Sequence, residues 1–114
     1  MKTVKPYLEH ILEECNFLIE KSKNLNYEKF IKNPVIMKAF VRSFEIIGEA
    51  VKKIPGNFKK KYKSIPWKEI AGMRDKLIHE YFGVNYKIVW ETLIKEIPKL
   101  KKNIEEILTE EGFL

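Results

Sequence analysis

The sequence predicts an all-α protein, built as an antiparallel bundle of four to five helices. Along four stretches, apolar residues recur at intervals of three and four, which is the spacing of a helix with one buried face. No stretch alternates apolar with polar residues, as a half-buried strand would. At 114 residues the chain has the length of one domain, so we expect residues 1–114 to form a single helical domain.

The first predicted helix has one apolar stripe and ends near residues 21–26. The stripe consists of Leu8, Ile11, Leu12, Cys15, Leu18 and Ile19. We expect a short helical turn over residues 27–31. Asn33 then caps a second helix, which opens at Pro34 and runs to about Ile54, where the sequence IPGN stops it. The apolar arc of this second helix is wide, which suggests contact with more than one neighbour, such as another subunit.

A third helix is expected to open at Pro66 and to contain WKEIAGMRDKLIHEY, residues 67–81. Glycine and asparagine within residues 83–85 separate it from a long fourth helix over residues 86–110. The apolar stripe of the fourth helix is Val89, Trp90, Leu93, Ile97, Leu100, Ile104, Ile107 and Leu108. Pro98 lies within this helix and should kink it, because proline offers no backbone N–H.

The net charge of +6 equals the charge of one basic segment. Between Val51 and Lys63 there are six lysines and no acid: Lys52, Lys53, Lys59, Lys60, Lys61 and Lys63. Such a segment favours a polyanionic partner, for example nucleic acid. A composition rich in lysine and glutamate also fits a solvated surface or adaptation to heat, and both interpretations stay open.

Composition excludes several classes of protein. A content of 45% hydrophobic and 33% charged residues is typical of a globular protein rather than a disordered one. No apolar run approaches the ~18 residues that span a membrane, and the N-terminus lacks a signal-peptide core. The one cysteine, Cys15, cannot form an internal disulfide and fits a cytoplasmic location. Because no Cys/His cluster is present, we expect no metal site, and we expect no cofactor.

Arg74 is one of two arginines among twenty-two basic residues, and it falls on the apolar stripe of the third helix. Burying a charged guanidinium in an apolar face costs free energy, unless the guanidinium is paired with an acid or the face lines a cleft or an interface. His79 lies five residues later, about 140° around an ideal helix. The two side chains therefore converge only if the helix loosens or if two copies face each other. Alternatively, Arg74 pairs with an acid of a neighbouring helix, and His79 is an ordinary residue at a helix end.

Glu45 and Glu49 lie one helical turn apart, with Arg42 on the same side. This arrangement is typical of a solvated face that is linked by salt bridges. The two glutamates could instead orient Arg74 or His79 from across a pair of helices.

Two segments resemble the HepT-like family of HEPN domains. They are FVRSFEIIGEAVKKI, residues 40–54, and IPWKEIAGMRDKLIHEYFGVNYKIVWETLIKEIP, residues 65–98. Members of this family are the toxin halves of toxin–antitoxin pairs whose other half is a minimal nucleotidyltransferase. The family motif is arginine, a polar residue, three further residues and histidine, often followed by one residue and a tyrosine. The sequence from Arg74 through Asp75 and His79 to Tyr81 is similar to it, with aspartate where asparagine is commoner.

The resemblance implies a HEPN-like bundle that forms a symmetric homodimer and acts as a metal-independent ribonuclease toxin of a type VII-like system. Arg74 and His79 would be catalytic, with Asp75 in support, in a composite site at the dimer interface. Tyr81 would receive AMP from the partner nucleotidyltransferase, the antitoxin, which silences the nuclease. As a core residue, Tyr81 would instead bury its ring and seek one hydrogen bond. The basic segment would contact RNA phosphates or the antitoxin, without reading sequence.

The expected chemistry suits these residue types. When an RNA 2′-hydroxyl attacks the adjacent phosphodiester, one group must take a proton and another must supply one, and histidine titrates near neutrality. Arginine stays charged and offers a planar fork of donors to phosphate oxygens. One chain supplies one motif histidine, whereas a symmetric dimer supplies two. Two alternatives remain: a non-catalytic helical module that pairs with a nucleotidyltransferase, and a purely structural helical dimer.

Overall fold

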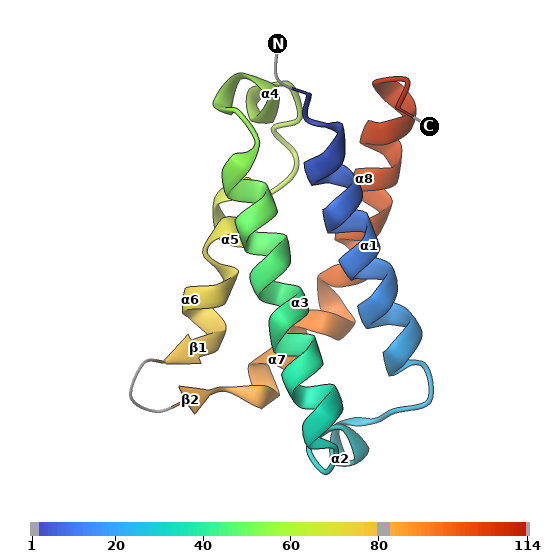
Figure 1. Cartoon of the computed structure of the whole chain (residues 1–114), viewed down its shortest axis with the longest axis vertical. Coiled ribbons are helices and arrows are strands. Elements are labelled where there is room, and N and C mark those ends of the chain that lie inside the picture. The colour runs from blue at the N-terminus through green and yellow to red at the C-terminus, as the bar shows by residue number, and fades with distance from the viewer. Residues whose placement is uncertain (1–2, 80–82, 114) are drawn as a thin grey trace.

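The computed structural model describes residues 3–79 and 83–113. Within these residues the chain forms eight helices and one short antiparallel hairpin, so the predicted helical class is confirmed. There are more helices than the four to five expected, because two predicted helices are each divided and the basic segment adds one. The long axis of the molecule measures 44 Å, and the longer helices run along it (Figure 1). No helix in the described ranges has both the length and the apolar character needed to cross a membrane.

Three long helices form the centre of the bundle: α1 (Lys5–Ser22), α3 (Pro34–Lys53) and α8 (Ile97–Glu110). α1 packs against both of the others and runs antiparallel to them (Figure 1). The predicted apolar stripes supply the core, which includes Leu8, Ile11, Leu18, Phe40, Phe44, Ile47, Ile104 and Ile107. The predicted start of α3 is confirmed, since the side chain of Asn33 accepts a hydrogen bond from the N–H of Ile36 at 3.2 Å.

An aromatic cluster holds the lower end of the bundle together. It joins α3 to α2 (Tyr27–Phe30) and α7 (Tyr86–Lys95). The ring of Phe30 is fully buried, and its centroid lies 5.5 Å from that of Phe40, 6.2 Å from that of Tyr86 and 5.2 Å from that of Trp90. Stacked, tilted and edge contacts at these distances are favourable between aromatic rings. The contacts of Phe30 with these three rings therefore hold the short α2 against α3 and α7.

The predicted third helix is wrong in its extent. The chain forms α5 (Trp67–Ala71) and α6 (Met73–Leu77), and then the strand β1 (Ile78–His79). The break falls at Gly72, because glycine is a poor helix former and a common end of a helix. A glycine in α3 brings α5 close: a Cβ on Gly48 would lie 3.4 Å from the backbone oxygen of Ala71. This close approach fixes α5, and α6 after it, against α3.

Ile78 and His79, expected in the third helix, instead form a strand of a hairpin. β1 pairs with β2 (Gly83–Val84), with Ile78 opposite Val84 and His79 opposite Gly83. The N–H of Asn85 donates to the carbonyl of Leu77 at 2.9 Å, which extends the pairing beyond the two strands. Gly83 has a φ of 76°, a left-handed conformation that glycine adopts without strain. His79 consequently lies in a strand, where we had expected it on the same helix as Arg74.

Two further elements differ from expectation. The basic segment, expected to be a loop, contains the short helix α4 (Gly56–Lys61). The expected fourth helix is divided at Glu96, with Pro98 in the first turn of α8. Inside an unbroken helix the proline ring would clash with the carbonyl four residues earlier, whereas the first turn tolerates it. The result is a break between α7 and α8 where we had expected a kink.

Candidate active site

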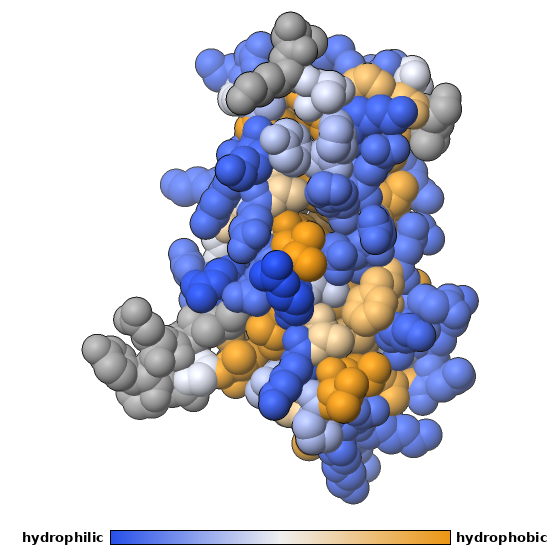
Figure 2. Space-filling model, in the orientation of Figure 1, coloured by the Kyte–Doolittle hydropathy of each residue, from blue (hydrophilic) through white to orange (hydrophobic). Residues whose placement is uncertain are grey.

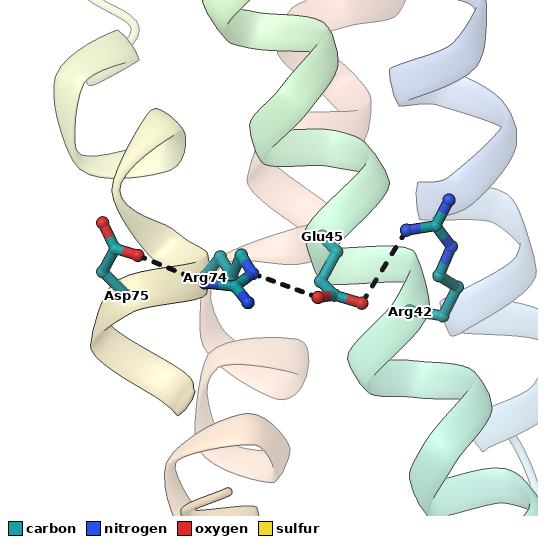
Figure 3. A network of polar contacts seen from close by, with 4 residues as sticks. All are labelled: Arg42, Glu45, Arg74 and Asp75. Atoms are coloured by element: carbon teal, nitrogen blue, oxygen red, sulfur yellow. Dashed lines mark hydrogen bonds and ion pairs between the residues drawn. The ribbon is translucent and has the colours of Figure 1, made fainter. Parts of the chain in front are cut away.

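Arg74 lies on α6 and reaches across to α3. Its Nε donates a hydrogen bond to Oε2 of Glu45 at 3.1 Å, while the Arg74 side chain remains 49% exposed (Figure 3). The alternative in which Arg74 pairs with an acid of a neighbouring helix is thereby confirmed. The expected position of Arg74 in a buried apolar face is wrong. α6 is turned relative to a helix that continues from α5, so Met73 is buried in place of Arg74, together with Leu77, which the apolar spacing also predicts to be buried.

Glu45 is shared by both arginines of the chain. Nη1 of Arg42 lies 3.8 Å from Oε1 of Glu45, and Nη1 of Arg74 lies 3.6 Å from Oδ1 of Asp75. Figure 3 shows Asp75, Arg74, Glu45 and Arg42 in a row from α6 to α3, and we call them the arginine row. Glu45 is the least exposed member, at 22% of its side chain. Exposed ion pairs contribute little stability. The main consequence of the row is therefore that it fixes where the Arg74 guanidinium lies.

Other predicted site residues are placed less directly. Glu49 is exposed one turn beyond Glu45, and the described residues form no salt bridge with it. The backbone of His79 follows α6 directly, in β1. The side chain of His79 and the whole of Tyr81 lie outside the described residues. The structure thus brings together Arg74, Asp75 and Glu45, and the approach of His79 to them stays a prediction.

The six lysines of the basic segment are not brought to Arg74. Lys52 and Lys53 end α3, and three others, Lys59, Lys60 and Lys61, lie in α4. Figure 1 places α4 at one end of the long axis and α6 with its hairpin toward the other. Within one chain, the basic segment therefore lies apart from the arginine row, in which two arginines are balanced by Glu45 and Asp75.

Comparison with known proteins identifies the family. Residues 11–107 match the family model described as "Ribonuclease HepT-like". The chain belongs to the HepT-like ribonuclease family. It is 66% identical over 97% of its length to "Putative RNase TTE0752" of Caldanaerobacter subterraneus subsp. tengcongensis, covering 99% of that protein. No solved structure gives a significant match.

Archaeal relatives are also similar to this HepT-like chain. "Putative RNase MJ1216" of Methanocaldococcus jannaschii is 54% identical over 94% of the chain and 88% of that protein. "Probable ribonuclease HepT" of Thermococcus cleftensis is 44% identical over 90% of the chain and 94% of that protein. The family assignment confirms the resemblance found in the motif from Arg74 to Tyr81.

Away from the arginine row, the HepT-like chain contains a polar cluster that sequence reasoning missed. Nζ of Lys61 lies 2.6 Å from Oε2 of Glu111, and the hydroxyl of Tyr62 donates a hydrogen bond to the same oxygen. We call these three residues the Glu111 cluster. Burial, followed by the hydrogen bond to Glu111, raises the pKa of Tyr62 well above its usual value. The hydrogen bonds from Lys61 and Tyr62 lower the pKa of Glu111. The cluster ties α4 to the end of α8, and no pattern signals a contact across about fifty residues.

A groove of about 970 Å³ runs between α5, α6 and α7. Its lining includes the apolar side chains of Ile70, Met73 and Ile88. Lysines and glutamates surround them, from α5 and α6 on one side and from α7 and its C-terminal end on the other. Such a mixed lining selects neither an anion nor a cation.

Buried nucleophiles and metal ligands are the last candidates for chemistry. Cys15 is fully buried, and burial raises the pKa of its thiol to about 12. A thiol in this environment stays protonated and unreactive. Among the residues that the structure describes, no three His, Cys, Asp or Glu side chains are grouped so as to hold a metal ion.

Proposed function

We propose that this HepT-like chain is a metal-independent endoribonuclease toxin, with Arg74 and His79 as its catalytic residues. The observation that supports the proposal is the position of Arg74. It is exposed, held by Glu45 and placed five residues before the histidine of the family motif. The names of the relatives, which describe ribonucleases, support the same class of substrate.

The proposed reaction is a transesterification within the RNA backbone. The 2′-oxygen of one ribose forms a bond to the adjacent phosphorus while the bond from phosphorus to the 5′-oxygen of the next nucleotide breaks. A neutral histidine takes the 2′-hydroxyl proton, and a protonated histidine supplies a proton to the departing 5′-oxygen. Arg74 stabilises the extra negative charge that develops on the non-bridging oxygens. The products are a 2′,3′-cyclic phosphate and a 5′-hydroxyl.

A homodimer would supply the two histidines that this reaction uses. The outer face of α3 is suited to such contact, because Val35 is 76% exposed while Ala39 and Ile46 are only partly buried. Figure 2 shows apolar groups on the side of the molecule over α1 and α3, between hydrophilic ones. Glu45 belongs to the same helix, and Arg74 lies beside it on α6. A two-fold axis near α3 would therefore bring two copies of the arginine row together.

Regulation would come from the cognate minimal nucleotidyltransferase. In the proposed step, the Tyr81 hydroxyl attacks the α-phosphorus of ATP, a phosphodiester to AMP forms, and pyrophosphate leaves. The added nucleotide would place bulk and negative charge beside Arg74, where an RNA phosphate would otherwise bind. The basic segment, near one end of the long axis of the molecule, remains a candidate contact for RNA or for the antitoxin.

Cleavage of a broad RNA pool in the presence of EDTA tests the proposal. Wild type, free of AMP on Tyr81 by mass spectrometry, should cut RNA and leave 2′,3′-cyclic phosphate ends. His79→Ala and Arg74→Ala should each reduce the rate by at least about 100-fold, since each removes a group that acts in the transition state. Their thermal unfolding should match that of wild type. Absence of cleavage by unmodified, dimeric wild type would favour the non-catalytic module that pairs with a nucleotidyltransferase.

A further inference from the structure

The two arginines of this lysine-rich chain meet at one carboxylate. Among twenty-two basic residues, only Arg42 and Arg74 are arginines, and they lie 32 positions apart in the sequence. They come from different helices, α3 and α6, yet both lie beside Glu45. The other basic residues are lysines. Two planar guanidiniums, both permanently charged, therefore lie close together on the surface beside Glu45.

The hydrogen bond to Glu45 uses one particular edge of the Arg74 guanidinium. Glu45 accepts from Nε, at 3.1 Å, which leaves Nη1 and Nη2 at the end of the side chain. Nη1 lies 3.6 Å from Asp75, too far for a good hydrogen bond, and the side chain of Asp75 is 78% exposed. The end of the guanidinium, which can bind two phosphate oxygens at once, is thus available to a ligand.

Arg42 is held more loosely on the other side of the same carboxylate. Its Nη1 lies 3.8 Å from Oε1 of Glu45, and its side chain is 61% exposed. At this distance the attraction orients Arg42 without using up its donors. Figure 3 shows Arg42 and Arg74 on opposite sides of Glu45, so a chain of phosphates could pass over Glu45 and reach both.

We propose that Arg42 binds a second backbone phosphate of the RNA next to the one bound by Arg74, and that Glu45 is the positioning residue for both arginines. This inference rests on the proposed ribonuclease function. It adds a binding residue outside the family motif, and it assigns the partly buried Glu45 a role in substrate binding. The alternating charges also limit how the RNA can lie: the two phosphates must contact the arginines on either side of Glu45, because Glu45 itself repels an anion placed directly on it.

Binding of an uncleavable single-stranded RNA, with a 2′-O-methyl group at every position, tests the role of Arg42. Each phosphate contact adds about 0.7 to the slope of log affinity against log salt concentration. Arg42→Gln should therefore lower the slope by about 0.7 and weaken binding several-fold. Lys38→Gln, which removes one charge from an exposed residue one turn earlier on α3, is the matched control and should change the slope much less. Arg42→Lys keeps the charge but loses the planar fork of donors, so its affinity for the RNA should lie between those of Arg42→Gln and wild type.

Steady-state cleavage tests the role of Glu45. Glu45→Gln should lower kcat about 10- to 100-fold with a smaller change in KM, because Arg74 keeps its charge but loses its fixed position. Glu9→Gln, which removes the same charge from an exposed residue of α1, is the control and should have a much smaller effect. The melting temperature of Glu45→Gln should stay close to that of wild type.

The outcomes separate this inference from the function on which it rests. If wild type cleaves RNA and Arg42→Gln shows the affinity and salt slope of wild type, the second phosphate contact is wrong. If Glu45→Gln changes only the melting temperature, Glu45 is a structural residue. If wild type neither binds nor cleaves RNA, the proposed ribonuclease function is wrong and this inference fails with it.

Discussion

The rotation of the short helix α6 about its own axis determines which residues surround Arg74. Continuous helical spacing from Trp67 would have buried Arg74, but the break at Gly72 leaves it exposed beside Glu45. Sequence alone identified the residue through the motif, because arginine five residues before histidine is a local feature. It offered Glu45 either as a salt-bridge partner of Arg42 or as a residue that orients Arg74, and it could not show that Glu45 contacts both. That arrangement depends on how closely α3 and α6 approach, which no local pattern records.

Replacement of Arg74 by lysine separates charge from shape. Arg74→Lys keeps a positive charge but loses Nε and the planar fork, so it cannot bond Glu45 and a phosphate at the same time. We expect kcat/KM for RNA cleavage to fall about 100-fold, as when one donor to a transition-state oxyanion is removed. Cleavage assays on wild type, Arg74→Lys and Arg74→Ala measure this. Equal rates for wild type and Arg74→Lys would show that a point charge is sufficient.

At the scale of elements, the sequence located helices better than it located their ends. Caps and prolines are local signals, and the predicted starts of α3 at Pro34 and of α7 at Tyr86 agree with the structure. The hairpin of β1 and β2 was missed, because its two residues per strand are too short to show a period. Pairing with β2 and the contact of Gly48 with α5 are tertiary effects that override local helix tendency.

The Glu111 cluster makes the stability of the folded chain depend on pH in two ranges, one acidic and one alkaline. The pKa of Glu111 is lowered in the folded chain, so its contribution is present above about pH 4.5 and is lost as the pH falls through the folded value. The pKa of Tyr62 is raised, so its contribution is present below about pH 10 and is lost as the pH rises through the folded value. Tyr62→Phe should therefore melt below wild type near pH 7, and the difference should narrow above pH 10.

Thermal unfolding monitored by circular dichroism between pH 3 and 11 measures this effect. Tyr27→Phe serves as the control. Tyr27 is also partly buried, but its hydroxyl forms no hydrogen bond within residues 3–79 and 83–113. A constant difference between Tyr62→Phe and wild type across the alkaline range would show that Tyr62 stabilises the chain by packing alone.

For the whole molecule, helical class followed directly from periodicity, because each buried stripe needs another stripe to cover it. The symmetric dimer stays a prediction. A single chain shows where apolar surface remains, as at Val35 on α3, whereas a dimer depends on how two such surfaces fit together, which no pattern within one sequence records. The same limit applies to the antitoxin and to the RNA, whose contacts depend on surfaces outside this chain.

Mixing active and inactive chains tests whether the active site is shared. If each site needs two copies of His79, a dimer of wild type with His79→Ala is inactive. With a tenfold excess of His79→Ala and random exchange of subunits, the cleavage rate per wild-type chain should fall about tenfold. The same excess of bovine serum albumin controls for dilution of the RNA by added protein. An unchanged rate would indicate that one chain is sufficient for cleavage.

The position of the chain ends bears on how the protein can be handled. The described residues begin and end, at residues 3 and 113, in the part of the molecule where α4 lies, whereas the hairpin of β1 and β2 lies toward the other end of the 44 Å long axis (Figure 1). A fluorophore, an affinity tag or a fused domain joined at either end would therefore lie away from the hairpin of β1 and β2. The protein can be immobilised on a sensor surface through either end, with α6 and the hairpin directed into solution.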